Sequence, residues 1–200
     1  MSTTYDLVTQ LASGFGSPSA RRVGVARGPA PRPVHAPVLP PEVLAEIVQG
    51  LALAEDLWRP HVAHDPRSRT SVRLIATPAY EVWLLGWTAG QRVQLHDHGG
   101  SEAAFTVVEG ELDELRLHGG RIDRVRHRTG ATATVASGTI HDVVHGGAGP
   151  ATSIHAYAAP LRSMTFYEPD GTPSFHELVE EVPALVDASA TARALHPSGR

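Results

Sequence analysis

The chain has 200 residues, of which 42% are hydrophobic and none is cysteine, and its formal net charge is −4. This length suits one domain with a sizeable core. The mildly acidic balance argues against nucleic acid or an anionic membrane as a partner. Without cysteine there are no disulfides or thiolate ligands, so any metal must be held by His, Asp or Glu. No apolar run approaches the roughly 18 residues that span a bilayer. The N-terminus also lacks the features of a signal peptide, so a cytoplasmic location is expected.

The N-terminal part is expected to be an arm followed by a helix. Residues 1–39 form the arm, which is rich in proline from residue 24 onward and is therefore interpreted as extended. A short helix is expected within it at 5–13. Apolar residues then recur at helical spacing, which predicts a helix over about 41–57 with prolines in its first turn. We assign residues 40–200 to the folded domain.

From residue 70 onward the sequence changes to short segments rich in β-branched and aromatic residues, separated by Gly, Pro, Asp and Ser. Closely spaced strands of this kind are typical of an antiparallel barrel or sandwich. Residues 174–195 are predicted to be helical, with a break at Pro183. The sequence therefore predicts a mostly β fold with helical flanks at both ends.

His96 and His98 are the first candidate metal ligands. They lie one residue apart in QLHDH, and a strand would point both side chains to the same face, where they could share one ion. Such a pair is a weak signal by itself. It gains weight from Gly90, which precedes His96 by five intervening residues, and from Gly110, which follows His98 after eleven.

A second block with regular spacing follows. Its pattern is G-x5-A-x-G-x2-H-x3-H, and its fixed positions are Gly130, Ala136, Gly138, His141 and His145. The two blocks together resemble the two motifs of the cupins, with alanine in place of a proline and the last histidine in place of an asparagine. This resemblance implies a jelly-roll barrel in which His96, His98 and His141 meet from facing strands. Imidazole ligands suit Fe, Zn, Cu or Ni, so ligand type alone does not choose the metal.

Two neighbouring residues have open roles. The cupin motif would have its glutamate at position 103, which is Ala103, whereas Glu102 is one residue earlier. A shift of one residue on a strand turns a side chain to the other face, so Glu102 is expected to point away from the metal unless a bulge restores it. His145 has the strand parity of the ligands, so it either lies behind them, faces the substrate, or is purely structural.

A hydroxyl, an imidazole and a phenol alternate in Ser153, His155 and Tyr157. Side chains that alternate on one strand face can form a hydrogen-bonded relay, although a polar row on an exposed face has the same spacing. With the two histidine blocks, this segment resembles the thiol dioxygenase family, typified by cysteine dioxygenase, over about 70–167. The resemblance implies non-haem Fe(II) on the three histidines and a catalytic relay of these three residues. The cysteine that cross-links to the tyrosine in animal members corresponds to Ala103, so no Cys–Tyr cross-link can form here.

The same resemblance implies an arginine for the substrate carboxylate. Arg73 is the candidate by its place before the histidine pair, with Arg69 as a rival. Arg162 is the rival if the chain belongs to the branch that oxidises 3-mercaptopropionate. The implied reaction is oxidation of L-cysteine by O2 to cysteine sulfinate, in a monomer. The alternatives are 3-mercaptopropionate or another small thiol as substrate, a sugar or acid isomerase of the cupin type, and a ligand-binding cupin without activity.

Overall fold

A computed structural model of the chain describes residues 38–179 and 182–187. The helical segments are α2 (Pro41–Leu53), α3 (Glu55–Trp58) and the 3-10 turn η1 (Arg59–His61). The strands are β1 (Thr70–Ala76), β2 (Glu81–Trp87), β3 (Glu102–Glu109), β4 (Glu111–His118), β5 (Arg121–Arg128), β6 (Thr132–Val135), β7 (His141–His145), β8 (Ala151–Ala158), β9 (Ser163–Tyr167), β10 (Pro173–Leu178) and β11 (Val186–Asp187). Strands thus dominate the described residues, as the sequence predicts.

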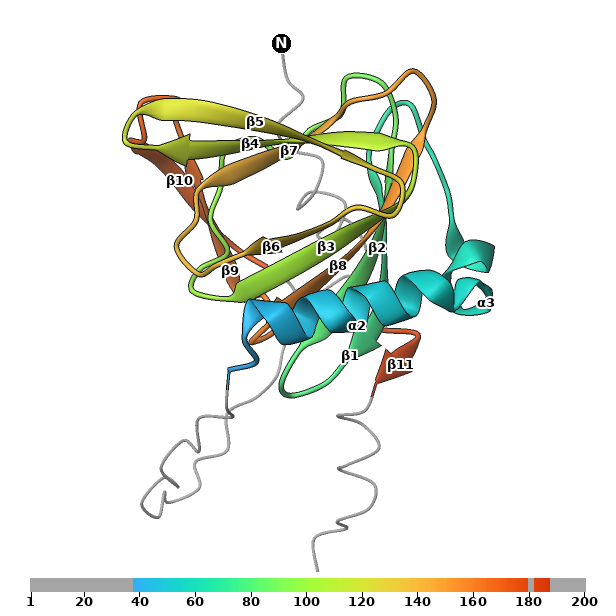
Figure 1. The fold of residues 1–200 in the computed structure, drawn as a ribbon. Coiled ribbons are helices and arrows are strands. Elements are labelled where there is room, and N and C mark those ends of the chain that lie inside the picture. Colours follow the sequence, from blue (N-terminus) through green and yellow to red (C-terminus); the bar gives the residue numbers. More distant parts are fainter. Residues whose placement is uncertain (1–37, 180–181, 188–200) are drawn as a thin grey trace, which may run out of the picture.

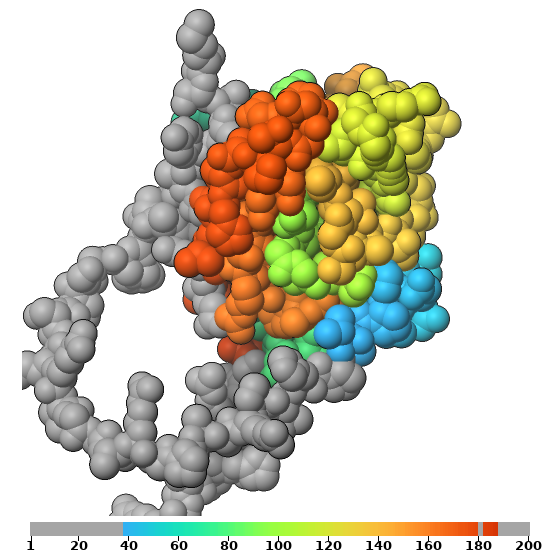
Figure 2. All heavy atoms as spheres, turned by 90° about the vertical axis from the view of Figure 1, so that its left-hand side faces the viewer, coloured from blue at the N-terminus to red at the C-terminus, as the bar shows by residue number. Residues whose placement is uncertain are grey.

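The strands form two facing layers, visible in Figure 1. The larger sheet has the order β11-β1-β2-β8-β3-β6, and the sheet opposite it has the order β5-β4-β7. A separate pair, β9 and β10, closes one side. Figure 2 views this side, with β9 and β10 in orange and red and the β4–β5 hairpin in yellow, so segments far apart in sequence build one wall.

Strand β2 explains how the core is divided. All seven of its residues are buried, and their side chains alternate between two hydrophobic clusters. Trp83, Leu85 and Trp87 face the space between the two sheets, whereas Val82 and Leu84 face helix α2. Because both faces of the large sheet are covered, β2 is a continuous apolar run and not an alternating one.

The predicted helix over 41–57 corresponds to α2 and α3, which are separated at Ala54, where the backbone leaves the helical region (φ −91, ψ 62). Leu44 and Val48, one turn apart, are fully buried against the large sheet. Among the described residues no helix is long and apolar enough to cross a membrane. The arm and its helix at 5–13 lie outside the described residues, apart from positions 38 and 39.

The helix predicted for the C-terminal tail is wrong over its first part. Residues 173–178 form strand β10, which pairs antiparallel with β9, and a short strand, β11, pairs with β1. Phe175 stacks on Phe166 with ring centroids 4.3 Å apart. This pairing overrides a helical pattern that the local sequence favoured. Residues 180–181 and 188–195 of the predicted helix lie outside the described residues.

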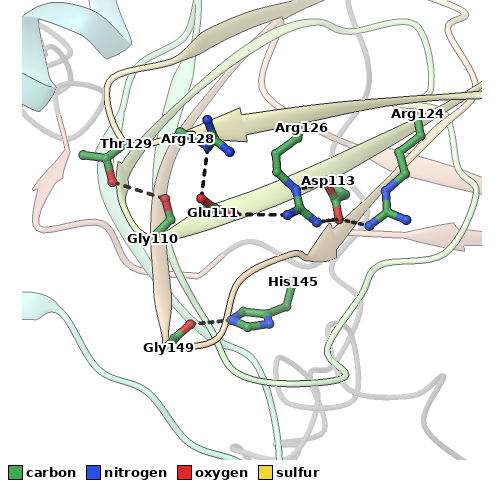
Figure 3. Close-up of polar contacts among 9 residues, drawn as sticks. All are labelled: Gly110, Glu111, Asp113, Arg124, Arg126, Arg128, Thr129, His145 and Gly149. Atoms are coloured by element: carbon green, nitrogen blue, oxygen red, sulfur yellow. Dashed lines mark hydrogen bonds and ion pairs between the residues drawn. The ribbon is translucent and has the colours of Figure 1, made fainter.

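The outer face of the small sheet has a network of ion pairs (Figure 3). Asp113 of β4 is 1% exposed and accepts hydrogen bonds from Arg126, whose Nε is 2.8 Å from Oδ1, and from Arg124. Glu111 accepts from Arg126 and Arg128 on the same strand β5. The hydrogen bonds from Arg126 and Arg124 outweigh burial and lower the pKa of Asp113 to about 2.

Asp113→Asn is expected to destabilise the protein by about 1–3 kcal/mol at neutral pH, because it removes the charge of a buried and paired carboxylate. The folded pKa lies below the unfolded value of about 3.9, so this stabilisation is present above pH 4 and is lost as pH falls towards 2. Urea unfolding of metal-free protein at pH 7 and pH 3 measures the difference. The exposed Asp123→Asn serves as control. An equal gap between Asp113→Asn and the unmodified protein at both pH values would contradict the assignment.

Candidate metal centre

His96, His98 and His141 lie together in the interior between the strands. All three are buried, and one ring nitrogen of each lies within 4.8 Å of the others. Their ring centroids are 4.7–5.0 Å apart, and the Nε2 atoms of His98 and His141 are separated by 3.3 Å. The spacing of the sequence blocks therefore predicted a true cluster, and it is the one group of potential ligands of this kind among the described residues.

The backbone brings the two blocks together. His96 and His141 exchange two hydrogen bonds, with N···O distances of 2.8 and 2.9 Å, so they form a directly opposed antiparallel pair. Side chains of directly opposed residues leave the backbone on the same face. The pair therefore places one imidazole from each sequence block side by side, and His98, two residues after His96, adds the third imidazole.

Hydrogen bonds fix which nitrogen of two of the rings is available. His96 donates its Nδ1–H to the carbonyl of Gln94 at 2.8 Å, and His141 donates its Nδ1–H to Glu114 at 2.9 Å. Both rings thus present Nε2 to the cluster. Gln94 adopts a left-handed backbone (φ 87) that turns its carbonyl to His96, a conformation uncommon outside glycine.

The residues fit a resident metal ion by the chemistry of their donors. Burial, followed by the neighbouring His141, holds the pKa of both His96 and His98 well below the usual range, so both imidazoles are neutral. Neutral imidazoles with free Nε2 lone pairs are metal ligands, and ions such as Fe, Zn, Cu or Ni accept them. With His141, these histidines would hold such an ion, and the ion could also bind other molecules.

Glu102 and His145 both lie outside this cluster. Glu102 accepts a hydrogen bond from the backbone N–H of Ser137, so its carboxylate is engaged away from the histidines, in line with the parity argument. His145 donates its Nε2–H to the carbonyl of Gly149 at 2.7 Å, near the ion-pair network (Figure 3). His145 is not among the residues that line the cavity, and the hydrogen bond it makes is to the backbone.

The three residues of the predicted relay lie next to the metal cluster. Ser153 Oγ and His155 Nε2 are 2.8 Å apart, and Trp87 donates its Nε1–H to the same hydroxyl at 2.9 Å. The ring of Tyr157 meets His98 edge-on at 5.1 Å and His155 at 6.4 Å, centroid to centroid. The relay residues thus run along β8 towards the cluster, and they are not an exposed polar row.

The three candidate arginines have very different surroundings. Arg69 is 5% exposed, lines the cavity beside the histidines and lies over the ring of Trp87 at 4.6 Å. Arg73 forms an ion pair with the buried Glu81 at 2.8 Å and donates to the carbonyl of Val182. Arg162 is exposed. Of the three, only Arg69 lines the cavity, whereas the guanidinium of Arg73 is engaged by Glu81. The choice of Arg73 as the substrate arginine stays a prediction from the sequence.

One cavity joins these groups. It has a volume of about 50 Å³, which suits a small ligand. Its polar lining includes the three clustered histidines, His155, Tyr157 and Arg69, and its remaining walls are mostly apolar, with Leu161, Met164 and Val179 among them. Burial raises the pKa of Tyr157, so the phenol stays protonated, and burial together with the Arg69 charge lowers the pKa of His155 to about 3.

Fold and site together define a mostly β protein with a buried three-histidine centre that could hold a metal ion, beside an arginine and a tyrosine. The family model of cysteine dioxygenase type I matches residues 40–169, and the chain belongs to this family. The matched range begins at the residue before α2 and ends just after β9, so it includes every residue of the cavity except Val179.

Solved structures similar to the chain include the protein TT1209 from Thermus thermophilus, with 20% identity, a TM-score of 0.47, and coverage of 51% of this chain and 93% of that one. A recombinant oxalate oxidase in complex with glycolate has 18% identity and a TM-score of 0.45, with coverage of 51% and 56%. A cupin 2 conserved barrel domain protein from Leptotrichia buccalis has 17% identity and a TM-score of 0.44, with coverage of 50% and 45%. The curated proteins contain no match to the chain.

Two histidines on the same strand provide a matched test of the metal centre. His141→Ala is expected to lower the affinity for Co(II) by more than the roughly 10–100-fold that loss of an outer partner costs, since it removes a ligand. His145→Ala, four residues away, should bind Co(II) as the unmodified protein does. Isothermal titration with Co(II) measures both, and tight binding by His141→Ala would exclude this residue as a ligand.

Proposed function

We propose that the protein is an iron-dependent thiol dioxygenase that oxidises the thiol of L-cysteine to cysteine sulfinate, with both oxygen atoms of O2 ending on sulfur. The observation that carries the proposal is the convergence of the three-histidine cluster, Arg69 and Tyr157 on one small cavity, in a chain of the cysteine dioxygenase type I family. The partners are then a small thiol and dioxygen, and the cofactor is Fe(II).

Iron would be held by Nε2 of His96 and His141 and by a ring nitrogen of His98, and when bound it would supply the Lewis acidity and redox chemistry that bring thiol and dioxygen together. The three ligands contribute no negative charge, so an anionic substrate sulfur balances the ion. The chain itself holds, orients and shields the substrate.

Arg69 is the group that would receive the substrate carboxylate. Its guanidinium is buried in the cavity, and the ring of Trp87 beneath it supports the side chain. A guanidinium binds a carboxylate through two parallel hydrogen bonds, which fix orientation as well as charge. A short thiol whose carboxylate is bound by Arg69 would extend through this small cavity towards the histidines.

Tyr157 would act as a hydrogen-bond donor to the reacting molecules. Its raised pKa keeps the proton on the phenol, and the ring of His98 lies against its edge. His155 stays neutral and is held by Ser153, which Trp87 in turn fixes. Trp87 therefore contacts both Arg69 and the Ser153 hydroxyl, so the proposed carboxylate site and the Ser153–His155 pair share one support.

The amine-free thiol 3-mercaptopropionate is the second candidate substrate, and one observation favours it. Among the described lining residues of the cavity none is acidic, so a free substrate ammonium would have no anionic partner there. L-cysteine avoids this cost only if its amine is neutral and directed at the metal. An isomerase of the cupin type is less well supported, because Glu102 is bound to Ser137 instead of approaching the histidines.

Aerobic incubation of the iron-loaded protein with L-cysteine and with 3-mercaptopropionate tests the proposal. Oxygen consumption matched by formation of the sulfinate is expected for at least one thiol, with a higher kcat/KM for L-cysteine. A higher value for 3-mercaptopropionate would reassign the substrate. If neither thiol consumes oxygen while iron is bound, the proposed function is wrong.

Substitution of the arginines separates their roles. Arg69→Gln is expected to lower kcat/KM for L-cysteine by about 10–100-fold, because a charged hydrogen bond contributes about 1.5–3 kcal/mol. Arg162→Gln should leave kcat/KM unchanged, and Arg73→Gln should lower stability by leaving Glu81 buried and unpaired. Steady-state kinetics and thermal unfolding are measured for all three variants. A larger decrease of kcat/KM in Arg162→Gln than in Arg69→Gln would assign carboxylate binding to Arg162 instead.

Tyr157→Phe is expected to bind iron normally and to turn over about 10–100-fold more slowly, because it removes one hydrogen bond from the reacting molecules and no metal ligand. Tyr80→Phe, a tyrosine packed on the helix side of the large sheet, is the control. Metal content and kcat are measured together. Unchanged kcat in Tyr157→Phe would remove the phenol from the mechanism.

A further inference from the structure

A buried carboxylate lies directly behind the cluster. Glu114 of β4 is 1% exposed, and its Oε1 accepts a hydrogen bond from the Nδ1–H of His141 at 2.9 Å. It does not belong to either histidine block of the sequence, and its side chain is not among those that line the cavity. It reaches the cluster only through His141.

The carboxylate is held by two further donors. His127 of β5 donates its Nε2–H to Oε2 at 3.1 Å, and Arg116 donates its Nε–H to Oε1 at 2.9 Å. His127 is itself 8% exposed and packs edge-on against Phe105 with centroids 5.2 Å apart. Arg116 is fixed at its other end by the carbonyl of Thr134. Both oxygens of the carboxylate are therefore engaged, and the carboxylate has a defined orientation.

The sheet register explains this arrangement. In the order β5-β4-β7, Glu114 is opposite Val125 on one side and Val143 on the other, while His127 and His141 each lie two residues away along the neighbouring strands. Diagonal neighbours on one face of a sheet are within reach of long side chains. One carboxylate on the central strand can thus bond an imidazole on each flanking strand.

We infer that Glu114 is a positioning residue of the metal centre, which locks His141 with Nε2 towards the ion and increases the electron donation of that ligand through the bond to its Nδ1–H. A carboxylate bound to the outer nitrogen of a ligand imidazole fixes its tautomer and raises its basicity. Imidazole ligands bring no negative charge of their own, so Glu114 places a negative charge one hydrogen bond from the ligand ring. His127 and Arg116 keep that charge aimed at His141. This inference rests on the metal centre of the proposed function and not on the identity of the thiol.

Glu114→Gln tests the inference, with Glu111→Gln as the matched control, since Glu111 is on the same strand and its carboxylate binds arginines on the outer face. Glu114→Gln keeps the shape of the side chain and removes its charge. It is expected to weaken Co(II) binding about 10–100-fold and to raise the Fe(III)/Fe(II) reduction potential. Glu111→Gln should change neither quantity. A potential equal in both variants and the unmodified protein would overturn the inference, because a merely structural role would not shift it.

A second measurement uses the unmodified protein loaded with Zn(II). Nitrogen-15 NMR of its histidines should show His141 coordinated through Nε2, with a slowly exchanging Nδ1 proton. Coordination through Nδ1 would overturn the inference even if Glu114→Gln failed to fold. Neither readout uses thiol or oxygen. If the protein oxidises thiols but Glu114→Gln and Glu111→Gln have the same Co(II) affinity and reduction potential, this inference alone is refuted. If the protein oxidises neither thiol but Glu114→Gln shows the expected changes in Co(II) affinity and reduction potential, the proposed function alone is refuted.

Discussion

The two backbone hydrogen bonds between His96 and His141 are the constraint on which the site depends. They join two segments 45 positions apart in the chain, and they make the separation of two imidazoles a property of strand pairing and not of side-chain flexibility. Asp142, the residue after His141, strengthens the same junction by accepting hydrogen bonds from the backbone of Val93 and Gln94. The strained backbone of Gln94 is therefore held from the opposite strand, and this is the conformation that fixes the ring of His96.

Much of the centre could be predicted from the sequence because it follows from spacing. The alternation expected of an extended segment predicted His96 and His98 on one face, and the motif spacing predicted Glu102 away from them. The choice between Arg69 and Arg73 could not be made in this way, because the two residues share strand parity. They differ in position along the strand by about 13 Å, at roughly 3.3 Å per residue. Only the pairing of β1 with β2 shows that Arg73 reaches Glu81 and that Arg69 reaches the cavity.

The burial of Glu114 and the strand structure of the C-terminal tail could not be predicted from the sequence for a similar reason. ELDELRLH contains three acidic residues with nothing to distinguish them, and the difference between a partly exposed Glu111 and a buried Glu114 arises from which face of the small sheet turns inward. The tail has apolar residues at a spacing that suits a helix, yet Phe175 finds Phe166 on β9 and the segment pairs as a strand. Both cases depend on neighbours distant in sequence, which local patterns do not contain.

The charges around the cavity restrict what the proposed enzyme can bind. A bound divalent ion would add to the positive charge of Arg69, and the charge of Glu114 behind His141 is already paired with Arg116, so the proposed site would have an excess of positive charge before a ligand enters. A short thiol with an ionised sulfur and a carboxylate would supply two negative charges, one at each end of the molecule. A simple alkyl thiol would supply only one of these charges, and a substrate with an added ammonium would restore part of the excess. These charges support small mercaptocarboxylates as the substrate class of the proposed function, with L-cysteine binding through a neutral amine.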